Sequence, residues 1–182
     1  MVNQPDGPVP RFGSLPCMTI QVREVRSQEY EEAGRVTADA YREFVRAGES
    51  AWEDYLRHIA DVAGRVERTS VLVAVEDGRI LGTATIEVDG RIDEAGDGPL
   101  GPEEAHIRML GVAQDARGRG VARALMAACE QRARERGRTL VTLHTTPRMP
   151  VAQRMYARLG YERGADRLFE DGFVLLSFSK RL

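Results

Sequence analysis

Residues 112–122 read Val-Ala-Gln-Asp-Ala-Arg-Gly-Arg-Gly-Val-Ala and lie between a short apolar run and a helical pattern. Two arginines and two glycines, Arg117 to Gly120, stand where a helix usually begins with a capping Ser, Thr, Asp or Asn. Cations at this end oppose the helix macrodipole, whereas a bound phosphate would reverse that sign and accept hydrogen bonds from the first amides. The pattern therefore predicts a phosphate-binding turn. The alternative is that Asp115 caps the helix and the glycines only form a turn.

Two widespread phosphate-binding motifs do not fit this segment. A Walker loop needs Lys-Ser or Lys-Thr after its last glycine, and neither pair is present here. A dinucleotide-binding turn needs a third glycine, but position 123 is arginine, and the next apolar run at 140–145 ends without an acid. Both of these motif interpretations are therefore weak.

The segment Arg117-Gly118-Arg119-Gly120-Val121-Ala122 resembles Arg/Gln-x-x-Gly-x-Gly/Ala, the pyrophosphate-binding signature of the GNAT acyl-CoA N-acyltransferases. A later segment, Ala152 to Tyr161, is similar to a second signature of that family, a helix that carries a tyrosine and ends in Gly-Phe or Gly-Tyr. The motif core covers residues 105–163, and the resemblance extends over residues 18–182. It implies an acetyltransferase enzyme that uses acetyl-CoA as cosubstrate and a primary amine of a small molecule or peptide as acceptor.

The resemblance also implies which residues hold the cosubstrate. The pyrophosphate would lie on residues 117–122, and Arg123 one turn further along would reach a phosphate. Leu110 and Val112 match strand positions whose backbone amide stabilises the thioester oxygen. The family's pantetheine-binding asparagine is replaced by Met149, so that contact is either missing or supplied by Thr145 or Thr146.

Four further residues are candidates for proton transfer, and two of them stand at positions that match the family's catalytic residues. Tyr156 matches the general acid that protonates the departing CoA thiolate. The family's glutamate base is replaced by His106, and histidine can accept an amine proton near neutral pH. Glu104 is the second candidate base and His144 the third. The structural alternatives are that Tyr156 and His106 only pack in the core and that Glu104 is an exposed loop acid.

The elements that position these residues follow from hydrophobic periodicity. Strands are predicted at 18–25, 71–75, 80–88, 105–112, 139–145 and 172–180, with a short one near 161–163. Helices are predicted from Ser27, as cap, to Phe44, from a capping box at Ser50 to Gly64, at 121–136, and from Pro150 to Gly160. This order predicts an α/β fold with a mixed sheet and helices on its faces. The resemblance specifies a mostly antiparallel sheet of six or seven strands, in which the parallel strands 105–112 and 139–145 splay apart around the cosubstrate.

The composition excludes several classes of protein. The chain has 26 basic and 28 acidic residues in 182, so it lacks the basic excess of a nucleic-acid-binding protein. It contains no apolar run near the roughly 20 residues that span a membrane. Its three histidines lack metal-ligand spacing, so no metal is expected, and two cysteines make no disulfide framework. We therefore expect a cytoplasmic protein with a flexible leader at 1–17 and one N-acetyltransferase domain at 18–182.

Several alternatives stay open at this stage. The chain could be a non-catalytic acyl-CoA-binding or regulatory module, or its acceptor could be a protein lysine or N-terminus. A homodimer through edge strands is compatible with the fold. The loop at 89–104 is either functional or a surface insertion. Four aromatic residues at helical spacing either belong to the core or line the acceptor pocket: Tyr41, Phe44, Trp52 and Tyr55.

Overall fold

The computed structural model describes residues 19–45, 50–90, 98–170 and 172–182. The predicted leader at 1–17, the first residue of the strand predicted from Met18, and part of the loop at 89–104 lie outside these ranges. The domain boundary at residue 18 therefore stays a prediction.

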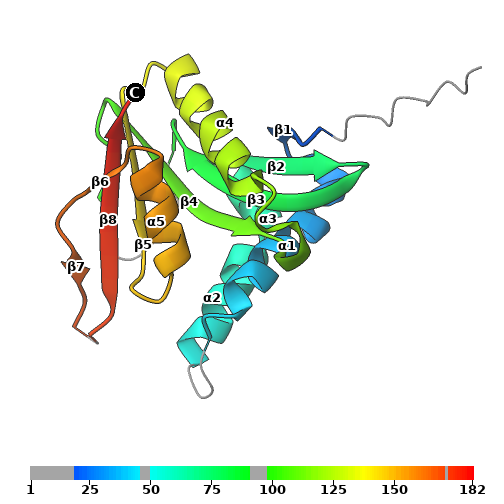
Figure 1. Cartoon of the computed structure of the whole chain (residues 1–182), viewed down its shortest axis with the longest axis horizontal. Coiled ribbons are helices and arrows are strands. Elements are labelled where there is room, and N and C mark those ends of the chain that lie inside the picture. The colour runs from blue at the N-terminus through cyan, green and yellow to red at the C-terminus, as the bar shows by residue number, and fades with distance from the viewer. Residues whose placement is uncertain (1–18, 46–49, 91–97, 171) are drawn as a thin grey trace, which may run out of the picture.

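A mixed sheet forms the centre of the fold (Figure 1). Its strands run in the order β1-β2-β3-β4-β5-β8-β6, and β7 pairs with β8 beside this path. Only the β4–β5 pair is parallel among the described pairs, which confirms the predicted mostly antiparallel sheet. The strands are β1 Gln21–Glu24, β2 Ser70–Glu76, β3 Arg79–Glu87, β4 Glu104–Val112, β5 Leu140–Thr145, β6 Glu162–Arg163, β7 Arg167–Leu168 and β8 Val174–Arg181.

Helices cover both faces of the sheet, as the alternation of β2 requires. Leu72 and Ala74 of β2 belong to the large core that contains α4 and α5 side chains. The alternate residues Val71 and Val73 point to the opposite face, where they pack with α1 and α3. The helices are α1 Tyr30–Arg42, α2 Ser50–Ala60, α3 Val62–Val66, α4 Val121–Glu135 and α5 Pro150–Arg158.

The helix predicted to continue to Gly64 is instead broken at Asp61. The Asp61 carboxylate accepts a hydrogen bond from the Gly64 amide at 3.0 Å and so caps the separate helix α3. Aspartate competes with the backbone inside a helix but satisfies exposed amides at a helix start. The apolar periodicity runs through this break and therefore concealed it.

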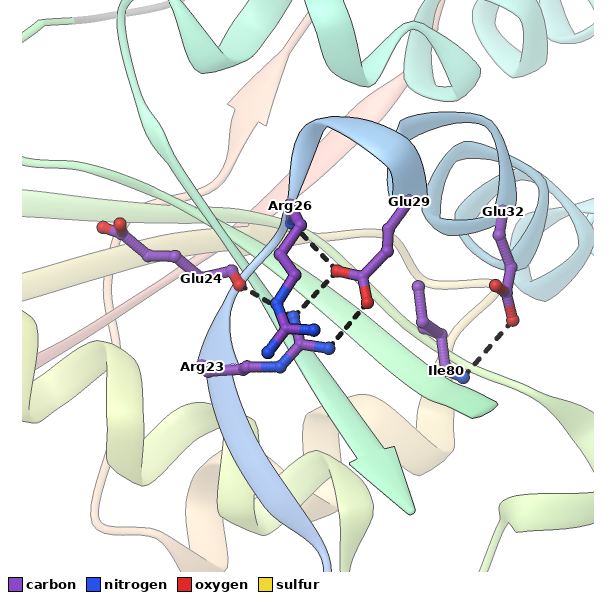
Figure 2. A network of polar contacts seen from close by, with 6 residues as sticks. All are labelled: Arg23, Glu24, Arg26, Glu29, Glu32 and Ile80. Atoms are coloured by element: carbon purple, nitrogen blue, oxygen red, sulfur yellow. Dashed lines mark hydrogen bonds and ion pairs between the residues drawn. The ribbon is translucent and has the colours of Figure 1, made fainter. Parts of the chain in front are cut away.

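The start of the first helical segment also differs from the prediction. Ser27 does not cap it, because Ser27–Glu29 form a short 3-10 helix before α1. The Glu29 carboxylate instead accepts hydrogen bonds from the Arg26 amide at 2.9 Å and from the Arg23 guanidinium at 2.7 and 2.6 Å (Figure 2). This network fixes the corner between β1 and α1. In the same view, Glu32 accepts a hydrogen bond from the Ile80 amide of β3.

The Glu29 network predicts a pH-dependent loss of stability. The hydrogen bond from Arg23 is the main cause that lowers the pKa of Glu29 from 4.5 to about 2. A carboxyl whose pKa is lower in the folded state stabilises the fold when ionised, so its contribution is complete above about 4.5 and is lost as pH falls through about 2. We expect Glu29→Gln to lower the melting temperature at neutral pH, and the difference from the parent to shrink over that acidic window.

Circular dichroism melts at several pH values measure this effect. Glu31→Gln, at an exposed position in the first turn of α1, is the matched control and should melt close to the parent throughout. A Glu29→Gln deficit that stayed constant down to pH 2 would contradict the assigned role.

Candidate active site

β4 and β5 separate part-way along their length (Figure 1). Their parallel pairing runs from Glu104 opposite Leu140 to Ile107 opposite Leu143. Beyond that point β4 continues to Val112 against β3, and β5 continues to Thr145 against β8. The predicted splayed pair of parallel strands is therefore present. The backbone groups that face the gap are available to a ligand, because neither strand pairs with the other there.

A backbone irregularity marks the separated part of β4. Met109 has a φ of +53°, in the left-handed region that non-glycine residues seldom adopt. The register with β3 shifts opposite it, between Thr83 and Thr85. Such conformations persist where the surrounding structure enforces them, and they concentrate at functional sites. The two predicted thioester-facing positions, Leu110 and Val112, follow directly and are both half-buried.

The turn before α4 has the open backbone that the sequence predicted. Gly118 and Gly120 have φ values of +76° and +84°, and a Cβ on either would meet nothing within 4 Å. Gly120 is the residue before the helix, and its carbonyl accepts the first helical hydrogen bond, from Ala124. No side chain caps α4. Asp115 instead pairs with Arg79 at 2.7 Å, so the alternative in which Asp115 caps this helix is wrong.

The arginines of this turn are held by acidic residues that the sequence analysis did not identify. Arg117 donates to both carboxylate oxygens of Glu43, at 3.0 and 2.8 Å. Arg119 donates to both oxygens of Glu76, at 2.7 and 2.6 Å, and this pair raises the pKa of the Arg119 guanidinium further. Arg123 lies exposed on α4. The first two arginines are therefore oriented by partners, and the uncapped amides supply the remaining donors for an anion.

Two histidines and one glutamate form a connected group at the end of the gap where β4 and β5 are still paired. His106 Nδ1 lies 2.7 Å from the hydroxyl of Thr142, which donates to Glu104 Oε1 at 2.6 Å. The rings of His106 and His144 lie 4.9 Å apart. His106 is 1% exposed, so it is a buried strand histidine with a polar partner. All three candidate bases are thus brought together, with Thr142 as the bridge between two of them.

Tyr156 projects from α5 into the core. It is 6% exposed, and its ring lies 5.6 Å from that of Phe178 and 6.1 Å from that of Tyr161. Burial raises its pKa above the usual value near 10, and the neighbouring Cys129 adds to this. Burial likewise raises the pKa of the Cys129 thiol to about 12. Both groups therefore stay protonated near neutral pH.

Comparison with known proteins agrees with this arrangement. Residues 32–161 match the model of the acetyltransferase (GNAT) family. The chain belongs to the GNAT family. A segment of 94 residues is 39% identical to a mycothiol acetyltransferase from Cellulomonas flavigena. That match covers 52% of this chain but only 27% of the relative, so most of the relative lies outside the comparison.

Solved GNAT structures share the fold of this chain. PaiA N-acetyltransferase from Thermoplasma acidophilum, solved with coenzyme A, has a TM-score of 0.69 at 14% identity, over 91% of this chain and all of the other. The acetyltransferase yncA from Salmonella typhimurium, solved with acetyl-CoA, has a TM-score of 0.63 at 17% identity, over 90% of this chain and 94% of the other. At these identities the likeness concerns the fold.

Two threonines of this GNAT chain carry buried hydroxyls with unused hydrogen-bonding capacity. Thr145 and Thr146 are 4% and 6% exposed, and neither hydroxyl oxygen has a hydrogen-bond partner. Both follow the point where β5 leaves β4, and Met149 stands three residues after the second. An unsatisfied buried hydroxyl costs about 1–3 kcal/mol. These two groups fit a pantetheine arm that offers amide donors and acceptors, in the place of the family's asparagine.

We expect Thr145→Val to separate stability from binding. Valine keeps the shape but removes the unsatisfied hydroxyl, so the free energy of unfolding should rise by about 1 kcal/mol. The affinity for acetyl-CoA should fall about tenfold, because one hydrogen bond to the ligand is lost. Chemical denaturation and calorimetry measure the two effects.

Thr37→Val is the matched control for this experiment. The Thr37 hydroxyl is buried but satisfied, by the Ala33 carbonyl at 2.8 Å and by Thr83 at 2.6 Å. Its removal should therefore destabilise the fold and leave the affinity unchanged. Equal destabilisation by both variants would contradict the role assigned to Thr145.

The four aromatic residues gather between α1 and α2. Tyr41, Trp52 and Tyr55 are half-buried and meet edge to face. Arg148, from the turn after β5, lies 5.8 Å over the Trp52 ring and donates to the carbonyl of Phe44. The turn that follows β5 therefore contacts the helical pair. The cluster stays a candidate for the acceptor side of the site.

Within the described ranges, no group of three or more His, Cys, Asp or Glu side chains is arranged to hold a metal ion. The helices of these ranges are also all too short or too polar to cross a bilayer.

Proposed function

We propose that this chain transfers an acetyl group from acetyl-CoA to a primary amine by direct attack of the amine. The observation that carries the proposal is the parting of β4 and β5 after Ile107 and Leu143, beside an uncapped helix start that opens on Gly118 and Gly120. Membership of the GNAT family supports the same activity. When bound, acetyl-CoA supplies an activated acetyl thioester.

Residues 117–122 and Arg123 would hold the pyrophosphate at the start of α4, and Thr145 or Thr146 would hold the pantetheine arm. This assignment fits the hydrogen-bonding groups at each place. The uncapped amides of α4 can donate to an anion, and the buried threonine hydroxyls can bond to the amides of the pantetheine arm. The amide of Leu110 or Val112 would stabilise charge on the carbonyl oxygen next to the bulge at Met109.

Proton transfer would use the two ends of the gap. A lysine-like amine is protonated near neutral pH, so it must lose a proton before it can attack. His106 would take that proton, and the second and third candidate bases lie close to it: Glu104 is bonded to the same Thr142 hydroxyl, and the His144 ring is 4.9 Å away. Tyr156 would donate a proton to the leaving sulfur, which its protonated hydroxyl permits.

A small-molecule acceptor is favoured over a peptide. The support is the relative at 39% identity over 94 residues, which is named for the small thiol mycothiol. That match includes only part of the relative, so the acceptor of this chain is proposed by class alone. The cytoplasm is the proposed location, because the buried Cys129 is a free thiol, as a reducing compartment maintains.

The test has a binding step and a turnover step. Isothermal calorimetry with acetyl-CoA and with coenzyme A tests the donor, and no heat at millimolar concentration would overturn the assignment. A thiol assay then follows coenzyme A release with a panel of small primary amines and lysine-containing peptides. Release with the small amines supports the proposal. Release with peptides alone would overturn the acceptor class, and tight binding with no release would favour a non-catalytic acyl-CoA-binding module.

A further inference from the structure

We propose that Thr142 is a positioning residue that connects Glu104 to His106 and fixes which ring nitrogen of His106 carries the proton. In this arrangement Nδ1 is protonated and donates to Thr142, and Nε2 is the nitrogen that exchanges protons with substrate. The catalytic part of this inference rests on the proposed function. The tautomer itself concerns only the protein and can be measured without any substrate.

The strand register brings the three residues together. Where β4 and β5 are paired, His106 lies opposite Thr142, and Glu104 lies two residues earlier on β4. Residues two apart on a strand share a face, so Glu104 and His106 of β4 share one face with Thr142 and His144 of β5. This group extends along the β4–β5 ladder from its first pair, at Glu104, to His144, one residue beyond the last pair at Ile107 and Leu143.

The hydrogen-bond inventory then determines the tautomer. A hydroxyl has one proton to donate, and the Thr142 hydroxyl has two acceptors on β4, Glu104 Oε1 at 2.6 Å and the more distant Ala105 carbonyl at 3.5 Å. The other carboxylate oxygen of Glu104 accepts from the Gly101 amide at 3.1 Å, which holds the carboxylate in place. Towards His106, 2.7 Å away, the Thr142 oxygen can therefore only accept. His106 Nδ1 must carry the proton, and in the neutral ring Nε2 is the basic nitrogen.

Other charged and titratable groups face His106 from both neighbouring strands. On β3, Glu87 lies opposite His106 and is fully buried, and its carboxylate pairs with Arg108 at 3.3 Å. On β5, the neighbouring group is the His144 ring. Arg108 offsets the charge of Glu87, and the Thr142 hydroxyl is hydrogen-bonded to both His106 and Glu104. Its loss should therefore weaken the preference of the ring for the Nδ1-protonated tautomer.

The experiment uses the full-length protein labelled with ¹⁵N-histidine. The chain has three histidines, so the His106 signals can be assigned by their loss in His106→Gln. We expect the Nδ1-protonated tautomer in the parent and in Thr142→Ser, and a mixture of tautomers in Thr142→Val. An Nε2-protonated His106 in the parent, or an unchanged tautomer in Thr142→Val, would overturn the proposal.

Kinetics provide the second measurement. Thr142→Val should lower kcat about tenfold, a fraction of the roughly 10²–10⁴-fold that a general base contributes. KM for acetyl-CoA should stay within about twofold of the parent value. Thr142→Ser should keep most of the parent's kcat, because serine retains the hydroxyl that bonds to His106 and Glu104. The acidic limb of the kcat profile should move to lower pH in Thr142→Val, because the acid that stabilises the protonated ring is disconnected. A merely structural threonine would leave this limb in place.

Thr139→Val is the matched control. Thr139 precedes β5, and its hydroxyl donates to the Glu103 carboxylate at 3.3 Å, so the substitution removes the same kind of bond at an exposed position away from the histidines. It should change neither the tautomer nor the pH profile. The two proposals fail separately. If Thr142→Val changes the tautomer but the parent protein has no transferase activity, only the proposed function is refuted. If the parent is active but Thr142→Val leaves the tautomer unchanged, only the role of Thr142 is refuted.

Discussion

Replacement of Arg119 and Gly120 together by glutamate is expected to lower the affinity for acetyl-CoA by more than about 100-fold, since two hydrogen bonds to a charged group are each worth about 1.5–3 kcal/mol. The double variant places two carboxylates where the first amides of α4 are uncapped, and these would take the position of the pyrophosphate. It also releases Glu76, now bound to Arg119. Calorimetry with acetyl-CoA measures the effect.

The opposite end of the same helix provides the control. Gly137 follows α4 with a φ of +69° and open space around it, so Arg134→Glu with Gly137→Glu introduces the same charges and a similar backbone strain. Negative charge at a helix C-terminus opposes the macrodipole, so this control should be the less stable variant. It should nevertheless bind acetyl-CoA like the parent. Equal losses of affinity in both variants would refute the assignment of the turn at 117–122.

Tyr156→Phe is expected to slow turnover about 10–100-fold and to leave acetyl-CoA binding nearly unchanged. This decrease in turnover is at or below the lower end of the contribution expected from general acid catalysis, about 10²–10⁴-fold. The reason is burial, which raises the pKa of the Tyr156 hydroxyl and makes proton donation to a thiolate, whose pKa is near 8.5, less favourable. Steady-state kinetics and calorimetry on the same preparation separate kcat from binding.

Tyr161→Phe is the control for this substitution. Tyr161 is also buried in the same core, and its hydroxyl donates to Glu130 at 3.2 Å. Loss of that hydroxyl should lower stability, because Glu130 loses a partner, while turnover should stay within about twofold of the parent. If Tyr156→Phe kept the parental rate, its hydroxyl would have no part in the reaction.

Local patterns in the sequence were sufficient to predict most of the elements and the turn that precedes α4. Short apolar runs located β2 to β5, and the glycines at 118 and 120 have the positive φ that their positions required. The errors arose where a polar side chain competed with an apolar pattern. Asp61 interrupts a continuous helical periodicity, and Glu29 rather than Ser27 organises the first corner.

The parts of the site that escaped prediction depend on partners far away in the chain. Arg117 and Glu43 are 74 residues apart, and Arg119 and Glu76 are 43 apart, so no local motif connects them. Thr142 was different, because a signal existed. Two parallel strands with polar residues at alternate positions, 104 and 106 on one and 142 and 144 on the other, can place all four on one face once the register is known.

The short ladder between β4 and β5 is the boundary between two parts of the sheet. β1 to β4 form one antiparallel block, β5, β8 and β6 form another, and in the described sheet four residue pairs join them. This seam has no more residue pairs than the edge ladder between β1 and β2, yet it joins the two blocks, so an opening that separates the blocks should begin there. A molecule wedged between the strands would bridge the two blocks. Occupancy would thus stiffen the whole protein from its middle.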